Sequence, residues 1–298
     1  MLRRRSLVAI FVVLALGAGA CAKSATSTTQ NGHLSPFQLV SQAASRTEAE
    51  KTARMSMSVS ITGGGMTGGS VSMSANGAID IAKQAAQMTF DMSGIPGAPT
   101  SMGFDIVVTG GALYMHLPPS AAAHIPSGKS WLKIDMAALS QQAGTGFGGL
   151  SGGSMTAFDP AQTLAYLKGV SKSVTHVGSD TVRGTATERY HVVIDPKKAI
   201  DKVSGSVKCG LGAAQKLLGK LTIPADVWID EQGRLRQMQM RFNMTPPGTT
   251  QPVGMTMQMD LFDFGTPVDV TAPPSSQVYD ATAGIASHLP STCAGTQA

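Results

Sequence analysis

The sequence has little charge and few aromatic residues. Of its 298 residues, 14% are Asp, Glu, Lys or Arg and 5% are Phe, Trp or Tyr. Three of the positive charges, Arg3, Arg4 and Arg5, lie before residue 21, and without them the formal net charge falls from +5 to +2. A nucleic-acid-binding surface needs clustered Lys and Arg, and aromatic rings on which bases stack. We therefore expect no nucleic-acid partner.

Residues that carry catalysis or bind metals are also sparse. No two histidines have a metal-binding spacing such as i, i+4 on a helix, and no paired carboxylates suggest acid–base chemistry. The six histidines are scattered, at positions 33, 116, 124, 176, 191 and 288. We expect no enzymatic activity, no metal and no cofactor.

Two enzyme-like patterns occur, both in the segment 144–153, in which six of ten residues are glycine. Its spacing of Gly144, Gly146 and Gly149 matches the dinucleotide-binding pattern, but that pattern needs a strand before it and a helix directly after. The stretch "GLSGG" matches a nucleophile elbow, which needs a buried strand leading into a sharp turn. Low complexity explains both matches.

The N-terminus is typical of an export signal. "MLRRRS" is a basic region, "LVAIFVVLALGAGA" is a short apolar region, and Cys21 follows directly. The stretch "LGAGAC" resembles a bacterial lipobox, although Ala18 stands where Leu is usual. We expect residues 1–20 to be a lipoprotein signal peptide, residues 21–34 a lipidated Cys21 with a flexible tether, and residues 35–298 a single domain. An ordinary secreted protein that is cleaved nearby is the alternative.

The chain has three cysteines, and two remain if Cys21 carries lipid. In an oxidising compartment, Cys209 and Cys293 are expected to form a disulfide, which would stabilise the fold by roughly 2–4 kcal/mol. A metal site from these two cysteines is the alternative.

Hydrophobic periodicity predicts a mostly antiparallel β protein. Ser35-Pro36 with Gln38 predicts a helix start, and we expect that helix to run to about Arg54. From Met55 the apolar residues alternate with polar ones, which indicates strands with one apolar face and one wet face. Strands are expected in the stretches 55–61, 71–76, 88–92, 102–108, 111–117, 130–136, 172–182, 184–195, 223–244 (a hairpin turning at Gln232-Gly233) and 254–265. Further helices are expected from Asp159, from Asp195 and in 209–219, for roughly ten or eleven strands and three or four helices.

Methionine is the one residue type in surplus, with seventeen residues against nine phenylalanines. In "RQMQMRFNM" and "GMTMQMDLFDFG" methionine recurs at every second position, so it faces one side of a strand. These residues could be ordinary core, or thioether ligands for Cu(I). Because methionine is flexible and polarizable, they could instead line a cavity that closes over variable apolar ligands.

The third interpretation predicts a curved sheet whose concave face is a lipid cavity. The residues expected to line that cavity are Met88, Phe90, Met102, Phe104, Ile106, Met238, Met240, Phe242, Met255, Met257 and Met259. Glycine allows a segment to open at little steric cost, so the segment around Gly146, Phe147, Gly148 and Leu150 is the candidate gate.

The order of several strand motifs resembles the LppX/LprAFG family of actinobacterial, mycobacterial-type lipoproteins, which are similar in fold to the lipoprotein carrier LolA. These motifs are "GALYMHL", "SWLKIDM", "GTATERYHVVID" and "ADVWIDEQGRLRQMQM", and they follow a lipobox. The residues that carry the resemblance are Tyr114, Trp131, Asp135, Tyr190, Asp195, Trp228, Asp230 and Gly233. The resemblance implies an α+β fold, a strongly curved antiparallel half-barrel with helices covering its concave side.

The resemblance also implies a function, namely to bind acyl chains of lipids or glycolipids and to carry or present them across the cell envelope. The expected partners are such lipids, the membrane through Cys21 and a membrane transporter, and the expected state is a monomer on the outer face of the cell membrane. The alternative is a non-carrier envelope lipoprotein that acts as a protein-interaction or sensing module. The apolar volume of the concave side distinguishes the two, because a carrier needs several hundred Å³ of open apolar space.

Overall fold

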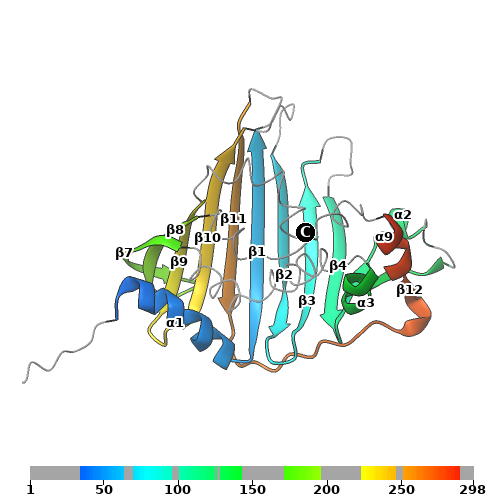
Figure 1. Cartoon of the computed structure of the whole chain (residues 1–298), viewed down its shortest axis with the longest axis horizontal. Coiled ribbons are helices and arrows are strands. Elements are labelled where there is room, and N and C mark those ends of the chain that lie inside the picture. The colour runs from blue at the N-terminus through cyan, green and yellow to red at the C-terminus, as the bar shows by residue number, and fades with distance from the viewer. Residues whose placement is uncertain are drawn as a thin grey trace, which may run out of the picture. The chain divides into compact units, whose positions relative to one another are not determined.

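Twelve strands form one large curved sheet in the computed structural model of the chain (Figure 1). The structure describes residues 34–63, 70–95, 101–123, 125, 128–142, 171–195, 223–245 and 251–288. All of them belong to one unit of the chain, Leu34–Ala298.

The elements follow one another in an order in which strands predominate. The helices are α1 (Pro36–Ala49), α2 (Pro119–Ala122), α3 (Met136–Gln142), the 3-10 turn η2 (Ser275–Gln277) and α9 (Thr282–His288). The strands are β1 (Thr52–Gly63), β2 (Val71–Asp80), β3 (Ala85–Ser93), β4 (Ser101–Thr109), β5 (Ala112–His116), β6 (Trp131–Asp135), β7 (Ser171–Val182), β8 (Thr185–Ile194), β9 (Ile223–Asp230), β10 (Leu235–Met244), β11 (Val253–Phe262) and β12 (Val278–Asp280).

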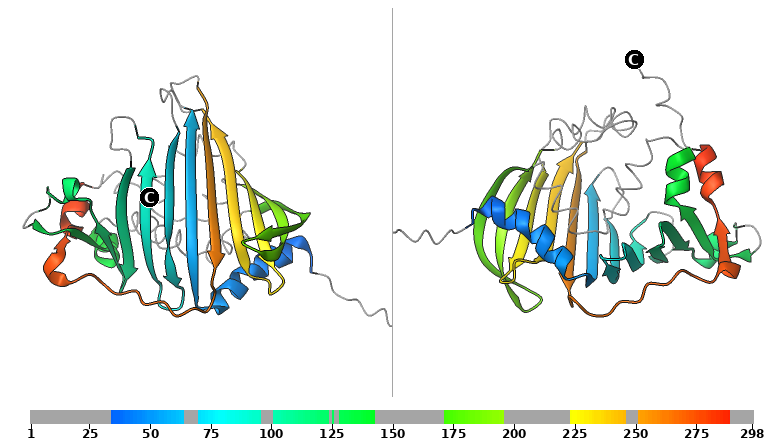
Figure 2. Two further views of the ribbon diagram at one scale, coloured as in Figure 1. Left: turned by 180° about the vertical axis from the view of Figure 1, so that it is seen from behind. Right: turned by 60° about the horizontal axis from the view of Figure 1, so that its bottom comes forward.

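The strand order in the sheet is β12-β6-β5-β4-β3-β2-β1-β11-β10-β9-β8-β7. Every neighbouring pair is antiparallel except β12 with β6, which is parallel. The first and second halves of the chain thus each form a meander, and β1 joins them by pairing with β11. The count of twelve exceeds the expected ten or eleven, and the three-residue strand β12 was not predicted. Both ends of the sheet turn toward the side on which α1, α3 and α9 lie (Figure 2).

Helix α1 begins as the sequence predicts and ends earlier. The Ser35 side chain accepts a hydrogen bond of 3.3 Å from the Gln38 amide, and the Gln38 side chain accepts one of 2.8 Å from the Ser35 amide. This capping box satisfies two backbone donors at the helix start. The expected end near Arg54 is wrong, because Lys51 turns the chain with a φ of 64° and β1 begins at Thr52.

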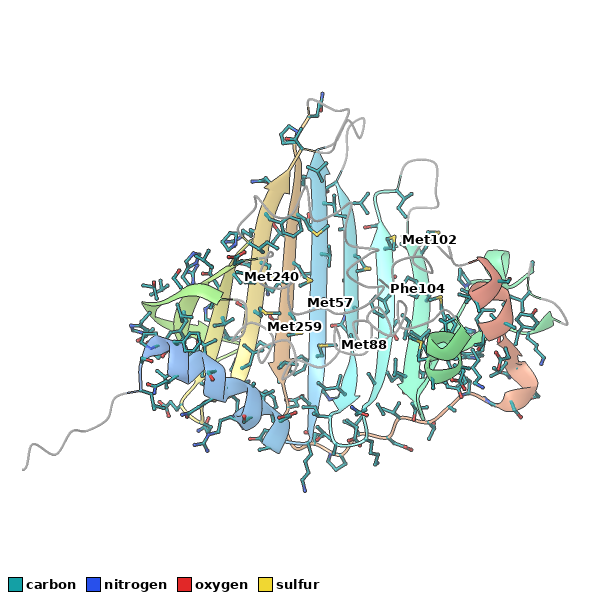
Figure 3. The ribbon with its side chains drawn as sticks, in the orientation of Figure 1. Met57, Met88, Met102, Phe104, Met240 and Met259 are labelled. Atoms are coloured by element: carbon teal, nitrogen blue, oxygen red, sulfur yellow. The ribbon has the colours of Figure 1, made fainter. Side chains whose placement is uncertain are left out.

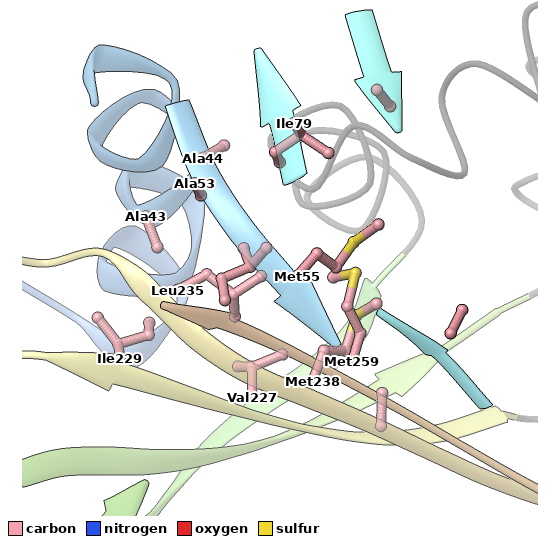
Figure 4. Close-up of a cluster of buried hydrophobic side chains, with 14 of the residues drawn as sticks. Ala43, Ala44, Ala53, Met55, Ile79, Val227, Ile229, Leu235, Met238 and Met259 are labelled. Carbon is pink, nitrogen blue, oxygen red and sulfur yellow. The ribbon is translucent and has the colours of Figure 1, made fainter. Parts of the chain in front are cut away.

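Part of the core lies between α1 and the sheet. Val40, Ala43 and Ala44 of α1 are buried, and they belong to one apolar cluster with side chains from β1, β9 and β10 and from further strands of the sheet. In Figure 4, Ala43 and Ala44 lie beside a layer of sheet residues that includes Met55 and Leu235. Small residues on the helix allow it to lie close to the strands, so α1 anchors this end of the sheet.

The described helices contact the two ends of the sheet. Helix α1 packs mainly on β7, β9 and β10, while α3 and α9 pack on each other and on β5 and β6. The expected cover of helices over the concave side is therefore not confirmed in the part of the chain that the structure describes. The helices expected from Asp159, from Asp195 and in 209–219 lie outside the described residues. None of the helices among the described ranges has the length and apolar character needed to cross a bilayer.

Candidate functional site

Strand pairing brings the alternating methionines onto one side of the sheet. Met57 of β1 lies opposite Met259 of β11, which lies opposite Met238 of β10. One row further along, Val59 lies opposite Met257, which lies opposite Met240. Because side chains alternate between the two faces of a strand, residues paired in this way share a face.

The same register continues across the other half of the sheet. Met57 pairs with Ala75 of β2, Ala75 with Phe90 of β3, and Phe90 with Phe104 of β4. We call this side of the sheet the methionine face. It comprises Met55, Met57, Val59, Ile61, Val71, Met73, Met88, Phe90, Met92, Met102, Phe104, Ile106, Met238, Met240, Phe242, Met255, Met257 and Met259. All the residues expected to line a cavity lie on it, and six of its members project from one side of the sheet in Figure 3.

Burial on the methionine face changes along the strands. Near the start of β1 the side chains are fully buried, with Met55 and Met88 each 1% exposed and Met238 2% exposed. Toward the other end of the same strands they are half-buried. These half-buried residues are Met57, Val59, Ile61, Val71, Met73, Met92, Met102, Phe104, Met240, Phe242, Met255 and Met257. The face therefore has a closed part, which packs as core, and a partly open apolar part.

Two contacts show how closely side chains of the methionine face pack. The rings of Phe90 and Phe104 stack with centroids 5.0 Å apart. Gly77 of β2 lies opposite Met88, and a Cβ at Gly77 would be 2.7 Å from the Met88 sulfur and 1.9 Å from the Gln87 carbonyl oxygen. Glycine is required there because the strands and the thioether occupy the space that a side chain would need.

The opposite face of the sheet is polar. Gln239 donates a hydrogen bond of 3.1 Å to Gln258 directly across from it, and Gln237 donates one of 2.8 Å to Asp260. Successive residues of one strand thus lie alternately on the polar face and on the methionine face.

A charged cluster lies on the polar face at β8 and β9. The Arg189 guanidinium donates a hydrogen bond of 2.6 Å to Asp226, and His191 Nδ1 lies 2.8 Å from the other carboxylate oxygen. Burial raises the pKa of Asp226, but the hydrogen bonds from His191 and Arg189 outweigh it and lower that pKa below its ordinary value. Sequence reasoning missed this cluster, because the three residues come from two strands and form no local motif.

Two of the residues that carry the family resemblance have structural roles at the hairpin between β9 and β10. The Asp230 carboxylate accepts hydrogen bonds from the backbone amides of Gln232 and Arg234, at 3.1 and 2.9 Å, and from the Arg234 side chain at 2.8 Å. Gly233 has a φ of 79°, which confirms the predicted turn at Gln232-Gly233. These residues fix the hairpin.

Several expected site residues cannot be placed. Cys21, Cys209, Cys293 and the segment with Gly146, Phe147, Gly148 and Leu150 lie outside the described residues. Within the ranges that are described, no three His, Cys, Asp or Glu side chains gather where a metal ion could be held.

Solved structures similar to this chain include LprF from Mycobacterium bovis and LppX, a lipoprotein from Mycobacterium tuberculosis. LprF is 16% identical, with 80% of this chain and 97% of LprF covered and a TM-score of 0.42. LppX is also 16% identical, with 79% and 98% covered and a TM-score of 0.43. The expected resemblance to the LppX/LprAFG family is confirmed.

A LolA superfamily protein from Nitrosomonas europaea is a more distant likeness, at 10% identity with 81% of this chain and 96% of that protein covered and a TM-score of 0.24. No family model and no curated protein sequence matches the chain. At these identities and TM-scores, the function has to be inferred from the chain's own side chains.

Proposed function

We propose that this chain is an exported lipoprotein that binds acyl chains of lipids or glycolipids on its methionine face and carries or presents them across the cell envelope. In this proposal residues 1–20 are the signal peptide, Cys21 is the lipid anchor and residues 22–34 are the tether. The domain 35–298 carries a disulfide between Cys209 and Cys293, and it acts as a monomer that exchanges lipid with the membrane or with a membrane transporter.

The observation that carries the proposal is the half-buried part of the methionine face. It spans β1 to β4, β10 and β11, and its side chains come from directly paired positions such as Met240 with Met257. A large, partly open apolar area on a protein is typical of a binding surface. Each CH₂ group moved from water onto such a surface contributes about 0.8 kcal/mol, so long acyl chains would bind readily.

The side-chain type supports a ligand of variable shape. Methionine is unbranched and polarizable, and it adapts to irregular apolar partners better than Leu or Ile. On this face it recurs in adjacent rows of three neighbouring strands, β1, β10 and β11, where a rigid core would favour branched residues with well-defined rotamers. We propose that the predicted helices after Asp159 and Asp195 cover the concave side and enclose the bound chains.

The proposal is tested by replacing one cross-strand pair on each face of β10 and β11. Met240→Asp with Met257→Asp places two carboxylates on the methionine face. Gln239→Asp with Gln258→Asp is the matched control, because it places two carboxylates opposite each other on the same strands and on the polar face. We expect the methionine pair to abolish binding of a fluorescent acyl probe, and the control to retain it.

Mass spectrometry of the gently purified, unmodified protein provides the second measurement. We expect a co-purifying amphiphile, with less of it on the methionine-face variant. If no amphiphile co-purifies and both variants and the parent fail to bind the probe, the carrier function is wrong. The protein would then be an interaction or sensing module of the envelope. Circular dichroism and urea unfolding establish that each variant is folded.

A further inference from the structure

The ends of the central strands differ in charge. At one end of β1 to β4, β10 and β11, the last residues of the strands carry no charge. We call this the uncharged end, and it lies at the top of the sheet in Figure 1. The uncharged end comprises residues 61–63, 70–72, 93–95, 101–102, 242–245 and 251–255, and the nearest charged residues along these strands are Arg241 and Asp91, which pair with Thr256 and Gly103. The residues that join these strand ends in the sequence, 64–69, 96–100 and 246–250, contain no charged residue either.

The opposite ends of the same strands are rich in charge. Their residues and the adjoining turns include Lys51, Arg54, Asp80, Lys83, Asp230, Glu231, Arg234 and Asp263. Several are paired, as in the contact of 3.3 Å between Lys83 and Asp80 and that of 3.7 Å between Arg54 and Asp263. We call this the charged end.

The burial of apolar side chains also differs between the two ends of these strands. At the charged end Met55, Leu235 and Leu261 are at most 1% exposed. At the uncharged end Ile61 and Met255 are half-buried on the methionine face. The partly open portion of the methionine face therefore continues to the uncharged end and not to the charged one.

Two glycines allow neighbouring strands to approach each other closely at the uncharged end. A Cβ at Gly63 would lie 2.1 Å from the Pro252 carbonyl oxygen, and a Cβ at Gly94 would lie 2.1 Å from the Ser70 carbonyl oxygen. Their φ angles are +87° and +82°, which glycine adopts without strain. Neighbouring strands thus approach closely up to their last residues.

We infer that the uncharged end docks on a lipid bilayer, so that acyl chains pass directly between the bilayer and the methionine face; this inference rests on the proposed function. A charged side chain is costly to place in the apolar part of a membrane, whereas Ser, Thr, Gly and Pro beside half-buried apolar residues are tolerated at its surface. The partner is a bilayer of neutral lipid, because the described residues of the uncharged end include no Lys or Arg to attract anionic headgroups, and the nearest cation, Arg241, pairs with Thr256 on the polar face.

The orientation is measured with the full chain in vesicles of phosphatidylcholine whose acyl chains are brominated or unmodified. Bromine quenches tryptophan only at short range. Thr62→Trp introduces a reporter at the uncharged end on the face opposite the methionine face, and Ala82→Trp introduces one in the exposed turn between β2 and β3 at the charged end. The signal of each reporter is taken relative to the parent protein, which contains Trp131 and Trp228.

We expect several-fold stronger quenching of the reporter at residue 62 than of that at residue 82, in low and in high salt alike. The docking orientation is overturned by equal quenching of the two reporters, by stronger quenching at residue 82, or by no quenching at either position. The last of these outcomes would point to a protein partner at this end. Uptake of the acyl probe from solution is measured on the same samples and on the parent protein. Normal uptake without quenching at residue 62 refutes this inference alone, whereas absence of uptake by the parent protein refutes the proposed function.

A second pair of variants keeps the methionine face intact. Thr62 and Ala82 are both exposed, so Thr62→Glu and Ala82→Glu add the same charge at opposite ends of the sheet. We expect Thr62→Glu to slow probe transfer from vesicles by roughly tenfold or more and to leave uptake from solution unchanged. Transfer that is slowed equally by Ala82→Glu, or by neither variant, contradicts the inference.

Discussion

The Leu235 amide at the start of β10 donates a hydrogen bond of 3.0 Å to Thr47 Oγ1 near the end of α1. Both residues are fully buried. The Thr47 hydroxyl in turn donates to the Ala43 carbonyl oxygen at 2.7 Å. One hydroxyl group therefore connects the helix to the sheet at the closed end of the methionine face.

Thr47→Val is expected to lower the free energy of unfolding by about 1–3 kcal/mol, because the Leu235 amide is left buried without an acceptor. Urea unfolding followed by circular dichroism measures the change. Thr47→Ser keeps the hydroxyl and serves as the control, with a smaller expected loss. An equal loss in both variants would mean that the methyl group matters here and the hydrogen bond does not.

Gly77→Ala is expected to destabilise the sheet by about 1–3 kcal/mol or more, since its new methyl group would meet the Gln87 carbonyl oxygen and the Met88 sulfur. Gly103→Ala is the matched control, because Gly103 is also a strand residue and a Cβ there would have no neighbour closer than 3.6 Å. Thermal unfolding of the two variants makes the comparison. Similar melting temperatures for both would contradict the close approach of β2 and β3 at Gly77.

Asp226→Asn is expected to destabilise the protein at pH 7 by about 1.5–3 kcal/mol, because hydrogen bonds to a charged group are lost. The pKa of Asp226 is lower in the folded protein than its ordinary value. Its ionised form therefore contributes stability above about pH 4, and this contribution is lost as the pH falls through the folded pKa.

The difference in urea midpoint between the parent and Asp226→Asn should accordingly shrink between pH 5 and pH 3. Asp91→Asn, at an exposed position of β3, is the control for the loss of one carboxylate, and at pH 7 we expect it to cost less stability than Asp226→Asn. A difference that stays constant down to pH 3 would assign the loss to packing and not to charge.

Replacing Met57, Met240 and Met257 with leucine is expected to leave the free energy of unfolding within about 1.5 kcal/mol per site, because the volume is conserved. The range of ligands should narrow, since leucine has fewer side-chain torsions and adapts less to a bent or branched chain. Displacement of the fluorescent probe by straight, unsaturated and branched fatty acids measures this. An unchanged order of affinities would show that methionine has no role in ligand tolerance.

The sequence predicted most strands correctly, because alternation of apolar and polar residues is a local property of a pleated strand. The stretches 102–108 and 254–265 correspond to β4 and β11, and the hairpin at Gln232-Gly233 has the glycine with positive φ that its tight turn needs. It failed at the end of α1, where a single residue, Lys51, reverses the chain. It also failed for β12, since three residues are too few to show a period.

The sequence by itself determined that methionines alternate with polar residues along each strand, and so that the sheet has an apolar face and a polar one. Only the tertiary structure decided that Met57, Met259 and Met238 share a row, that one end of that face is buried, and that Arg189 and His191 meet Asp226. The physical reason is the separation in sequence of the residues that determine each feature. Alternation follows from the geometry of one strand, whereas register and burial depend on contacts between strands that lie far apart in the chain.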